Sequence, residues 1–326
     1  MGIDRRARDR ILNLLKILVS VGLLILLITQ IDLGQTLERL ARLKWGFFLA
    51  ALALYWAGVL VRAYRWGSLL WGLNVQVSWW RLVGLYFVGS FFSLVLPTGL
   101  GGDVVRIYEL SQDSRETGAA ISSVLVDRFL GLFVLFAMAL LALAGGYQMV
   151  GGQIRALIAI VFVACLVLAA LVLQRTWIER WGARLGVDRL LGRIKVLRQL
   201  YESLHLYRSQ ALLRATAASV LFNLMLILVN YLLARAVGIG VPLAYYFLFI
   251  PIISALLMLP SIGGLGVRET AYVVLFGQVG VDRDHALALA LVYLATLVCT
   301  GLIGAGLYII QSARGARRGS QGPQST

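Results

Sequence analysis

The chain has 326 residues, of which 60% are hydrophobic and 14% are charged, and its formal net charge is +15. Its mean hydropathy is +0.86, and several apolar runs reach the length of about 20 residues that a helix needs to cross a hydrocarbon core. This composition excludes a soluble enzyme and predicts an all-α polytopic membrane protein. Spans and connectors use nearly the whole length, so we expect residues 1–326 to form a single integral-membrane domain.

Hydropathy predicts about six full transmembrane helices. The basic start, MGIDRRARDR, precedes an apolar run that is too long for a signal-peptide core and lacks a cleavage site, so we interpret this run as a retained first span. The predicted spans are residues 11–31, 46–70, 118–146, 153–174, 211–237 and 286–311.

Two further apolar stretches are each interrupted by a proline and a cluster of glycines. No part exceeds about 17 residues, the lower limit for a spanning helix. We therefore predict two re-entrant helix-turn-helix elements, each entering and leaving the membrane by one face. Their parts are residues 80–96 and 103–112 around Pro97, and residues 243–259 and 267–278 around Pro260.

The distribution of positive charge predicts the orientation. With the amino terminus inside, 20 arginines and lysines fall on the cytoplasmic side and 5 on the outer side. This bias predicts a multi-pass protein of the cell inner (plasma) membrane with both termini cytoplasmic. The positive charge then needs no nucleic acid, and a basic amphipathic stretch at 190–204 suits the anionic inner leaflet. A membrane partner or a homo-oligomer stays open.

The two interruptions are similar in sequence. LPTGLGGDVVR at 96–106 is echoed by LPSIGGLGVRE at 259–269, and the span count makes the two elements enter from opposite faces. Such similarity with opposite orientation predicts an inverted repeat. The predicted division is 1–152 for the first half, 153–210 for a connecting span and basic cytoplasmic loop, 211–311 for the second half, and 312–326 for a basic disordered tail.

The two turns are predicted to border a cavity. Irregular backbone at membrane depth is tolerated only where protein covers it or water reaches it. The free amide groups at the start of the second short helix suit an anion such as a phosphate. Proline breaks each incoming helix and glycine permits close approach. The residues expected to build the turns are Pro97, Gly99, Gly101, Gly102, Pro260, Gly263, Gly264 and Gly266.

Charged side chains within apolar segments are the candidate binding residues. A charge at the centre of a spanning helix costs about 2.5 to 3.5 kcal/mol on insertion scales, so its presence indicates a function. The substrate-binding candidates are Arg62, Arg65, Asp103, Arg106, Asp127, Arg128, Arg268 and Glu269. We assign the anion to Arg62, Arg65, Arg106 and Arg268, and we interpret Asp103 and Glu269 as pairing or proton-coupled acids.

Several of these residues have a structural alternative. Arg62 and Arg65 could instead reach the cytoplasmic headgroups, with their apolar stems lying along the span. Asp127 and Arg128 could belong to a buried ion pair that anchors helix packing. Asn223 and Asn230 are interpreted as interhelical hydrogen-bonding residues rather than ligand contacts.

Four motifs together resemble a known family. They are RAYRW at 62–66, FFSLVLPTGLGGDVVRIY at 91–108, VDR at 126–128, and LPSIGGLGVRE at 259–269. Over roughly residues 10–311 the chain resembles the lysylphosphatidylglycerol synthase transmembrane family, the flippase-like domain of multiple-peptide-resistance-factor proteins. The resemblance implies two re-entrant elements and movement of a lipid between leaflets. Larger relatives carry a fused synthetase that makes an aminoacylated phosphatidylglycerol. We expect no such synthetase domain here, so phospholipids and polyprenyl-phosphate carriers stay open as cargo.

The first hypothesis is therefore a lipid flippase or scramblase that binds a phosphate-bearing lipid and uses no cofactor or metal. A membrane enzyme using Asp103 or Glu269 as acid or base is an alternative. Against it, the sequence has only His205 and His285, neither in an apolar run, and no paired metal-ligand spacing. A non-transporting subunit of an envelope lipid or glycan pathway is a third.

Overall fold

The computed structural model describes residues 41–96, 101–114, 116–144, 207, 209–258 and 264–320, with a few isolated positions between 152 and 163. Within these residues the secondary structure is helical throughout, which confirms the predicted all-α class. The helices are α3 (Trp45–Gly72), α4 (Trp79–Val95), α5 (Gly101–Ser114), α6 (Thr117–Ala144), α11 (Ser209–Ala236), α12 (Leu243–Leu256), α13 (Val267–Gly277) and α14 (Arg283–Ser320).

Four of these helices are long and apolar enough to cross a membrane. They occupy Trp45–Gly72, Thr117–Leu143, Ser209–Ala236 and Arg283–Gln311. The long apolar helices predicted at 46–70, 118–146, 211–237 and 286–311 are therefore confirmed to within a few residues. The predicted spans at 11–31 and 153–174, and the amphipathic stretch at 190–204, lie outside the described residues.

The carboxyl-terminal part corrects one expectation. Helix α14 continues to Ser320, so the first residues of the tail predicted as disordered, from 312 onward, are helical. Alanine and arginine, which are frequent in this stretch, are strong helix formers, and the first proline beyond it is Pro323. A basic composition alone therefore did not end the helix at the predicted boundary.

The interrupted stretches form two pairs of short helices. In the first pair α4 packs against α5, and in the second α12 packs against α13. Gly102 makes the first contact possible, because a Cβ atom there would collide with the carbonyl oxygen of Gly89 and the hydroxyl of Ser93 in α4. The predicted helices at 80–96, 103–112, 243–259 and 267–278 are thus present. The turn residues Pro97, Gly99, Pro260 and Gly263 lie outside the described residues.

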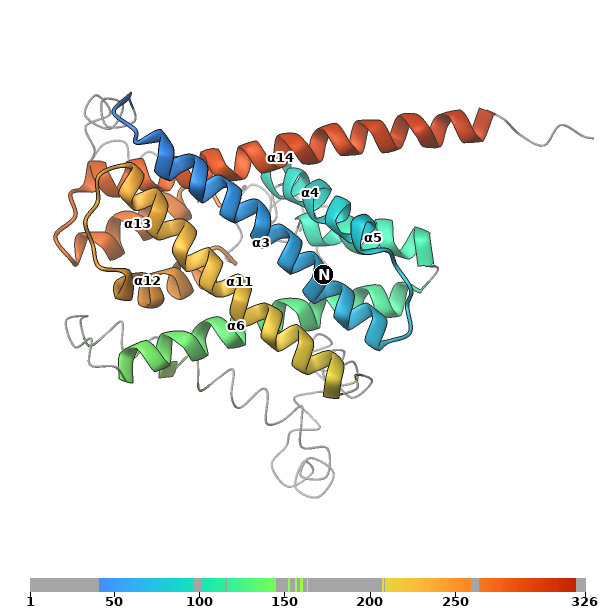
Figure 1. Ribbon diagram of the computed structural model, residues 1–326, viewed down its shortest axis with the longest axis horizontal. Coiled ribbons are helices and arrows are strands. Elements are labelled where there is room, and N and C mark those ends of the chain that lie inside the picture. Colours follow the sequence, from blue (N-terminus) through green and yellow to red (C-terminus); the bar gives the residue numbers. More distant parts are fainter. Residues whose placement is uncertain are drawn as a thin grey trace, which may run out of the picture.

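The order long, short, short, long occurs twice, as α3 to α6 and as α11 to α14. Helices α3 and α11 pack antiparallel. The Lys44 amide before α3 donates a hydrogen bond of 3.0 Å to the Ala236 carbonyl at the end of α11, and Gly72 faces Ala211 at the opposite ends. The first helices of the two sets, α3 and α11, therefore run in opposite directions (Figure 1).

Packing between the two sets is reciprocal. The short helix α4 of the first set packs against α14 of the second, and the short helix α12 of the second packs against α6 of the first. Figure 1 shows α14 passing beside α4, with α12 above α6. Each half is thus completed by a long helix of the other, which places the two short-helix pairs around a shared interior.

The side chains follow this arrangement. One buried apolar cluster joins α11 to α14 around Tyr246, Phe249 and Phe276, and another joins α3, α4 and α5 around Trp66 and Leu82. Large apolar side chains are also exposed on the outer faces of the long helices, such as Leu141, Leu213 and Leu302. Exposed apolar surface on this scale is unfavourable in water and suits a surrounding bilayer.

Candidate functional site

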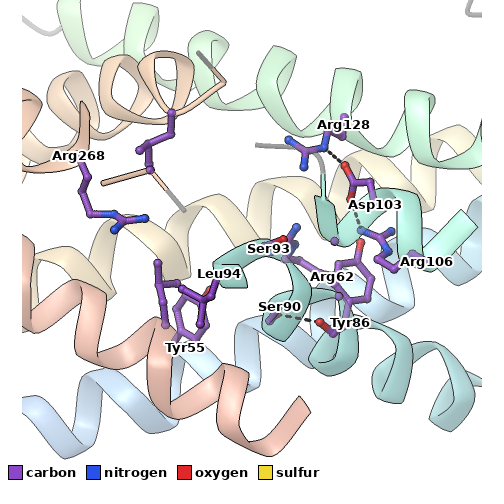
Figure 2. A pocket seen from close by; sticks show the side chains of 15 residues that line it. Tyr55, Arg62, Tyr86, Ser90, Ser93, Leu94, Asp103, Arg106, Arg128 and Arg268 are labelled. Carbon is purple, nitrogen blue, oxygen red and sulfur yellow. Dashed lines mark hydrogen bonds and ion pairs between the residues drawn. The ribbon is translucent and has the colours of Figure 1, made fainter. Parts of the chain in front are cut away.

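A cavity of about 210 Å³ lies between the two halves of the protein. Its wall includes side chains from α3, α4, α5 and α6 of the first half and from α13 and α14 of the second. Figure 2 shows the labelled side chains approaching this space from several helices. Five of the eight predicted binding residues line it, namely Arg62, Asp103, Arg106, Arg128 and Arg268.

The charge of this region is positive. Among the lining residues, the arginines Arg62, Arg106, Arg128 and Arg268 face a single acid, Asp103. The other three predicted residues, Arg65, Asp127 and Glu269, are buried without lining the cavity. The eight residues together comprise five arginines and three acids. Guanidinium groups bind phosphate or carboxylate oxygens through paired, charge-assisted hydrogen bonds, so the cavity is suited to an anion.

Asp103 connects two of the arginines. It lies in the first turn of α5, where the helix dipole favours a negative charge. One carboxylate oxygen accepts a hydrogen bond of 3.1 Å from Nη1 of Arg106, and the other forms an ion pair with Nε of Arg128 in α6. Both interactions are drawn in Figure 2. The acid therefore holds α5 to α6 at the edge of the cavity.

Arg106 is held by aromatic rings. Its guanidinium carbon lies 3.8 Å from the ring centroid of Tyr86 and 4.2 Å from that of Trp66, distances at which a cation is attracted to the ring faces. The residue is only 3% exposed. Its Nε and Nη2 groups have no hydrogen-bond partner among the described residues, although Nη2 lies 3.7 Å from Asp127. A buried guanidinium in this state retains capacity for an anion.

A second ion pair lies behind the cavity wall. Nε of Arg65 donates to Oδ1 of Asp127 at 2.6 Å, and both side chains are almost fully buried. The Tyr86 hydroxyl donates to the other Asp127 oxygen at 2.9 Å, and Arg65 also donates to Ser219 in α11. Arg65 therefore does not reach the headgroups, so that alternative is wrong for it. The buried-pair alternative for Asp127 is confirmed, with Arg65 as its partner.

Arg62 lies one helical turn before Arg65 and faces the cavity. Its guanidinium carbon is 4.8 Å from the Tyr86 ring centroid and 5.1 Å from that of Phe222. Its Nε group is buried without a hydrogen-bond partner among the described residues. Tyr86 thus contacts both Arg62 and Arg106, and its ring helps to position their guanidinium groups.

The second half contributes Arg268, while the neighbouring acid has a structural contact. Oε2 of Glu269 accepts a hydrogen bond of 2.6 Å from the Gly266 amide and so caps α13. Gly264 has a φ of +77°. A Cβ atom at Gly264 would also lie 2.8 Å from Nη2 of Arg268. The glycine therefore permits both the turn and the position of this arginine, which approaches the cavity from the side opposite Arg128 (Figure 2).

The chain is similar to known membrane proteins over most of its length. A protein-family model described as the lysylphosphatidylglycerol synthase TM region matches residues 13–304. The chain belongs to this family. It is also similar to the UPF0104 membrane protein PH1989 of Pyrococcus horikoshii, with 24% identity over 317 residues that cover 87% of this chain and 92% of that protein. No solved structure matches the chain.

The predicted resemblance to the lysylphosphatidylglycerol synthase transmembrane family is thereby confirmed, and its motifs fall on the cavity. RAYRW supplies Arg62 and the buried Arg65, GGDVVR supplies Asp103 and Arg106, and the second-half motif supplies Arg268.

Other lining residues of this family member were not predicted from the sequence. Tyr86, Ser90 and Ser93 of α4 and Tyr55 of α3 also line the cavity. The three polar residues of α4 are spaced by four and three positions, so they share one face of the helix. This spacing within an apolar stretch is the signal that could have found them.

The two asparagines have the predicted structural role. Nδ2 of Asn223 donates to the Gly131 carbonyl of α6 at 3.0 Å, and Oδ1 of Asn230 accepts a hydrogen bond from the Tyr272 hydroxyl of α13. Both contacts join different helices, so the interpretation as interhelical hydrogen-bonding residues is confirmed. Within the described part of the chain, no group of three metal-ligating side chains comes together.

Proposed function

We propose that the protein is a flippase-like or scramblase-like transporter that moves a phosphate-bearing lipid between the leaflets of the inner membrane. The observation that carries the proposal is the cavity lined by arginines from both halves. The cargo is a phospholipid, an aminoacyl-phospholipid or a polyprenyl-phosphate carrier, transported without chemical change. Both termini are cytoplasmic, and the two short-helix pairs are re-entrant elements from opposite faces.

The dimensions and lining of the cavity support a headgroup as its occupant. About 210 Å³ is below the usual range of pockets that enclose a whole drug-sized ligand, and it is far smaller than a lipid with its acyl chains. The arginines offer hydrogen bonds to phosphate oxygens, and Leu94, Leu257 and Leu297 provide an apolar side. The phosphate would bind inside while the acyl chains stay in the bilayer.

The reciprocal packing supports a mechanism for movement. Because α4 packs on α14 and α12 packs on α6, a rotation of one half against the other changes both short-helix pairs together. Two related halves rocking around a midplane site would expose that site alternately to each leaflet. The arginines from both halves would hold the phosphate during this exchange.

The test is transbilayer movement of fluorescent phosphatidylglycerol in proteoliposomes, measured by dithionite quenching. We expect the wild type to exceed protein-free vesicles and Arg268→Gln to be at least about tenfold slower, the loss expected for one charge-assisted contact. Arg235→Gln is the matched control, because Arg235 is exposed and bonds Tyr231 within its own helix. Wild-type movement equal to that of empty vesicles across several headgroups contradicts transport, and a modified lipid found by mass spectrometry indicates an enzyme.

A further inference from the structure

The cavity contains its own anion. Among the described residues that line it, Asp103 is the one acid, and its two carboxylate oxygens contact arginines from different helices, Arg106 in α5 and Arg128 in α6. The Asp103 side chain is only 10% exposed, whereas the Arg128 side chain is 33% exposed. The carboxylate therefore bridges a buried cation and one that reaches the open part of the cavity.

This bridging arrangement is one that a phosphate can reproduce. A phosphate group presents two or more oxygens that accept the same charge-assisted guanidinium hydrogen bonds as a carboxylate. Asp103 and a phosphate would therefore compete for the nitrogens of Arg106 and Arg128. Glu269 is less well placed to compete: its Oε1 lies 3.9 Å from Nη1 of Arg268, its Oε2 bonds the Gly266 amide, and the residue does not line the cavity.

We propose that Asp103 is a built-in competing anion that pairs with Arg106 and Arg128 when the cavity is empty and is displaced by the phosphate of an entering lipid. This inference rests on the proposed function of the same site. The competition has two consequences. Asp103 compensates the positive charge of Arg106 and Arg128 between transport events. It also weakens lipid binding enough for release, since a transport site must let its cargo leave as well as enter.

The experiment compares Asp103→Asn, Asp103→Glu and Asp282→Asn as purified full-length proteins in detergent. Asp282→Asn is the matched control, because it removes the same charge from an exposed side chain outside the cavity. Binding of dihexanoyl phosphatidylglycerol and of inorganic phosphate is measured separately by microscale thermophoresis. Melting curves and size-exclusion profiles identify any variant that fails to fold, and Asp103→Glu then still tests the effect of a retained charge.

We expect Asp103→Asn to bind the short-chain lipid about tenfold more tightly than the wild type, the change expected for one lost charge-assisted contact. Asp103→Glu and Asp282→Asn should stay within about threefold of the wild type. In proteoliposomes Asp103→Asn should transport more slowly, because release becomes limiting. Tightening for the lipid alone supports a lipid headgroup as the occupant, and tightening for both ligands supports competition by the phosphate group itself.

Unchanged or weaker binding by folded Asp103→Asn for both ligands overturns the inference, and so does an Asp103→Glu variant that binds as tightly as Asp103→Asn. These results are separable from the proposed function. If Asp103→Asn binds more tightly but the wild type shows no transbilayer movement, the competition stands and the transport proposal is wrong. If the wild type transports lipid but Asp103→Asn does not bind more tightly, the transport proposal stands and the competition is wrong.

Discussion

The two halves share an order of helices but fill the space beside the cavity with different chemistry. In the first half, Arg65 and Arg106 pair with Asp127 and Asp103. In the second half, Arg268 forms a looser ion pair of 3.9 Å with Glu269, and its guanidinium carbon lies 5.9 Å from the ring centroid of Tyr293. Tyr293 contacts an aromatic cluster through Tyr272. Its rings are Tyr246, Phe249, Tyr272 and Phe276, with centroid separations of 5.2 to 5.7 Å around Phe276.

This difference indicates different roles for the two halves. The first half carries buried charges whose mutual contacts set the position of the cations, and such networks are sensitive to the loss of one member. The second half is held by apolar and aromatic packing and adds a single arginine to the cavity. Variants of the two halves should therefore lose stability and lipid binding to different extents.

The largest effect is expected for the buried ion pair of the first half. Asp127→Asn leaves Arg65 as an uncompensated buried charge, so the free energy of unfolding should fall by about 3 to 5 kcal/mol. Thermal unfolding in detergent, followed by size exclusion, measures this loss. The double variant Arg65→Met with Asp127→Leu should recover most of the stability, because it removes both charges. A single variant whose melting curve overlays the wild type would show that the pair is not a structural anchor.

The next effect concerns the contact between α4 and α5. Gly102→Ala places a Cβ atom against the Gly89 carbonyl and the Ser93 hydroxyl, and overpacking of this kind costs about 1 to 3 kcal/mol. It should also displace Asp103, the next residue, and so disturb its contacts with Arg106 and Arg128. Gly118→Ala in α6 is the control, because no atom lies within 4 Å of its added Cβ. Equal melting temperatures for the two variants would disprove the close-packing role of Gly102.

The smallest effect separates the two halves most clearly. Tyr272→Phe in the second half removes the hydrogen bond to Asn230, and Tyr86→Phe in the first half removes the one to Asp127. Each loss should cost about 1 kcal/mol of stability. Binding of short-chain phosphatidylglycerol should weaken a few-fold only in Tyr86→Phe, because the lost hydrogen bond to Asp127 fixes the ring that contacts Arg62 and Arg106. Equal losses of lipid affinity in both variants would mean that the two halves contribute equally to lipid binding.

Much of the fold follows from sequence because the signals are local. Hydropathy and length predict the four described spans, and proline with glycine predicts the interruptions between α4 and α5 and between α12 and α13. The depth of the charges within apolar segments identifies Arg62, Asp103, Arg106 and Arg268 as candidates, and all four line the cavity.

The pairing of these charges could not be predicted in the same way. Arg65 and Asp127 are 62 residues apart, and Asp103 and Arg128 are 25 apart, so their contacts depend on how helices rotate and pack. The similarity of the two motifs also suggested comparable roles for Asp103 and Glu269. The structure separates them, since Glu269 caps α13 beside a glycine that gives no side-chain capping signal in the sequence.

The central claim is that both halves bind one lipid phosphate in one shared cavity. The most direct measurement is the amount of co-purified phospholipid per protein for Arg128→Gln, Arg268→Gln and the double variant, determined by native mass spectrometry. A shared site predicts that each single variant loses bound lipid and that the double variant loses little more, because residues contacting one ligand are not additive. Full retention of lipid by Arg268→Gln alongside loss in Arg128→Gln would contradict a site built from both halves.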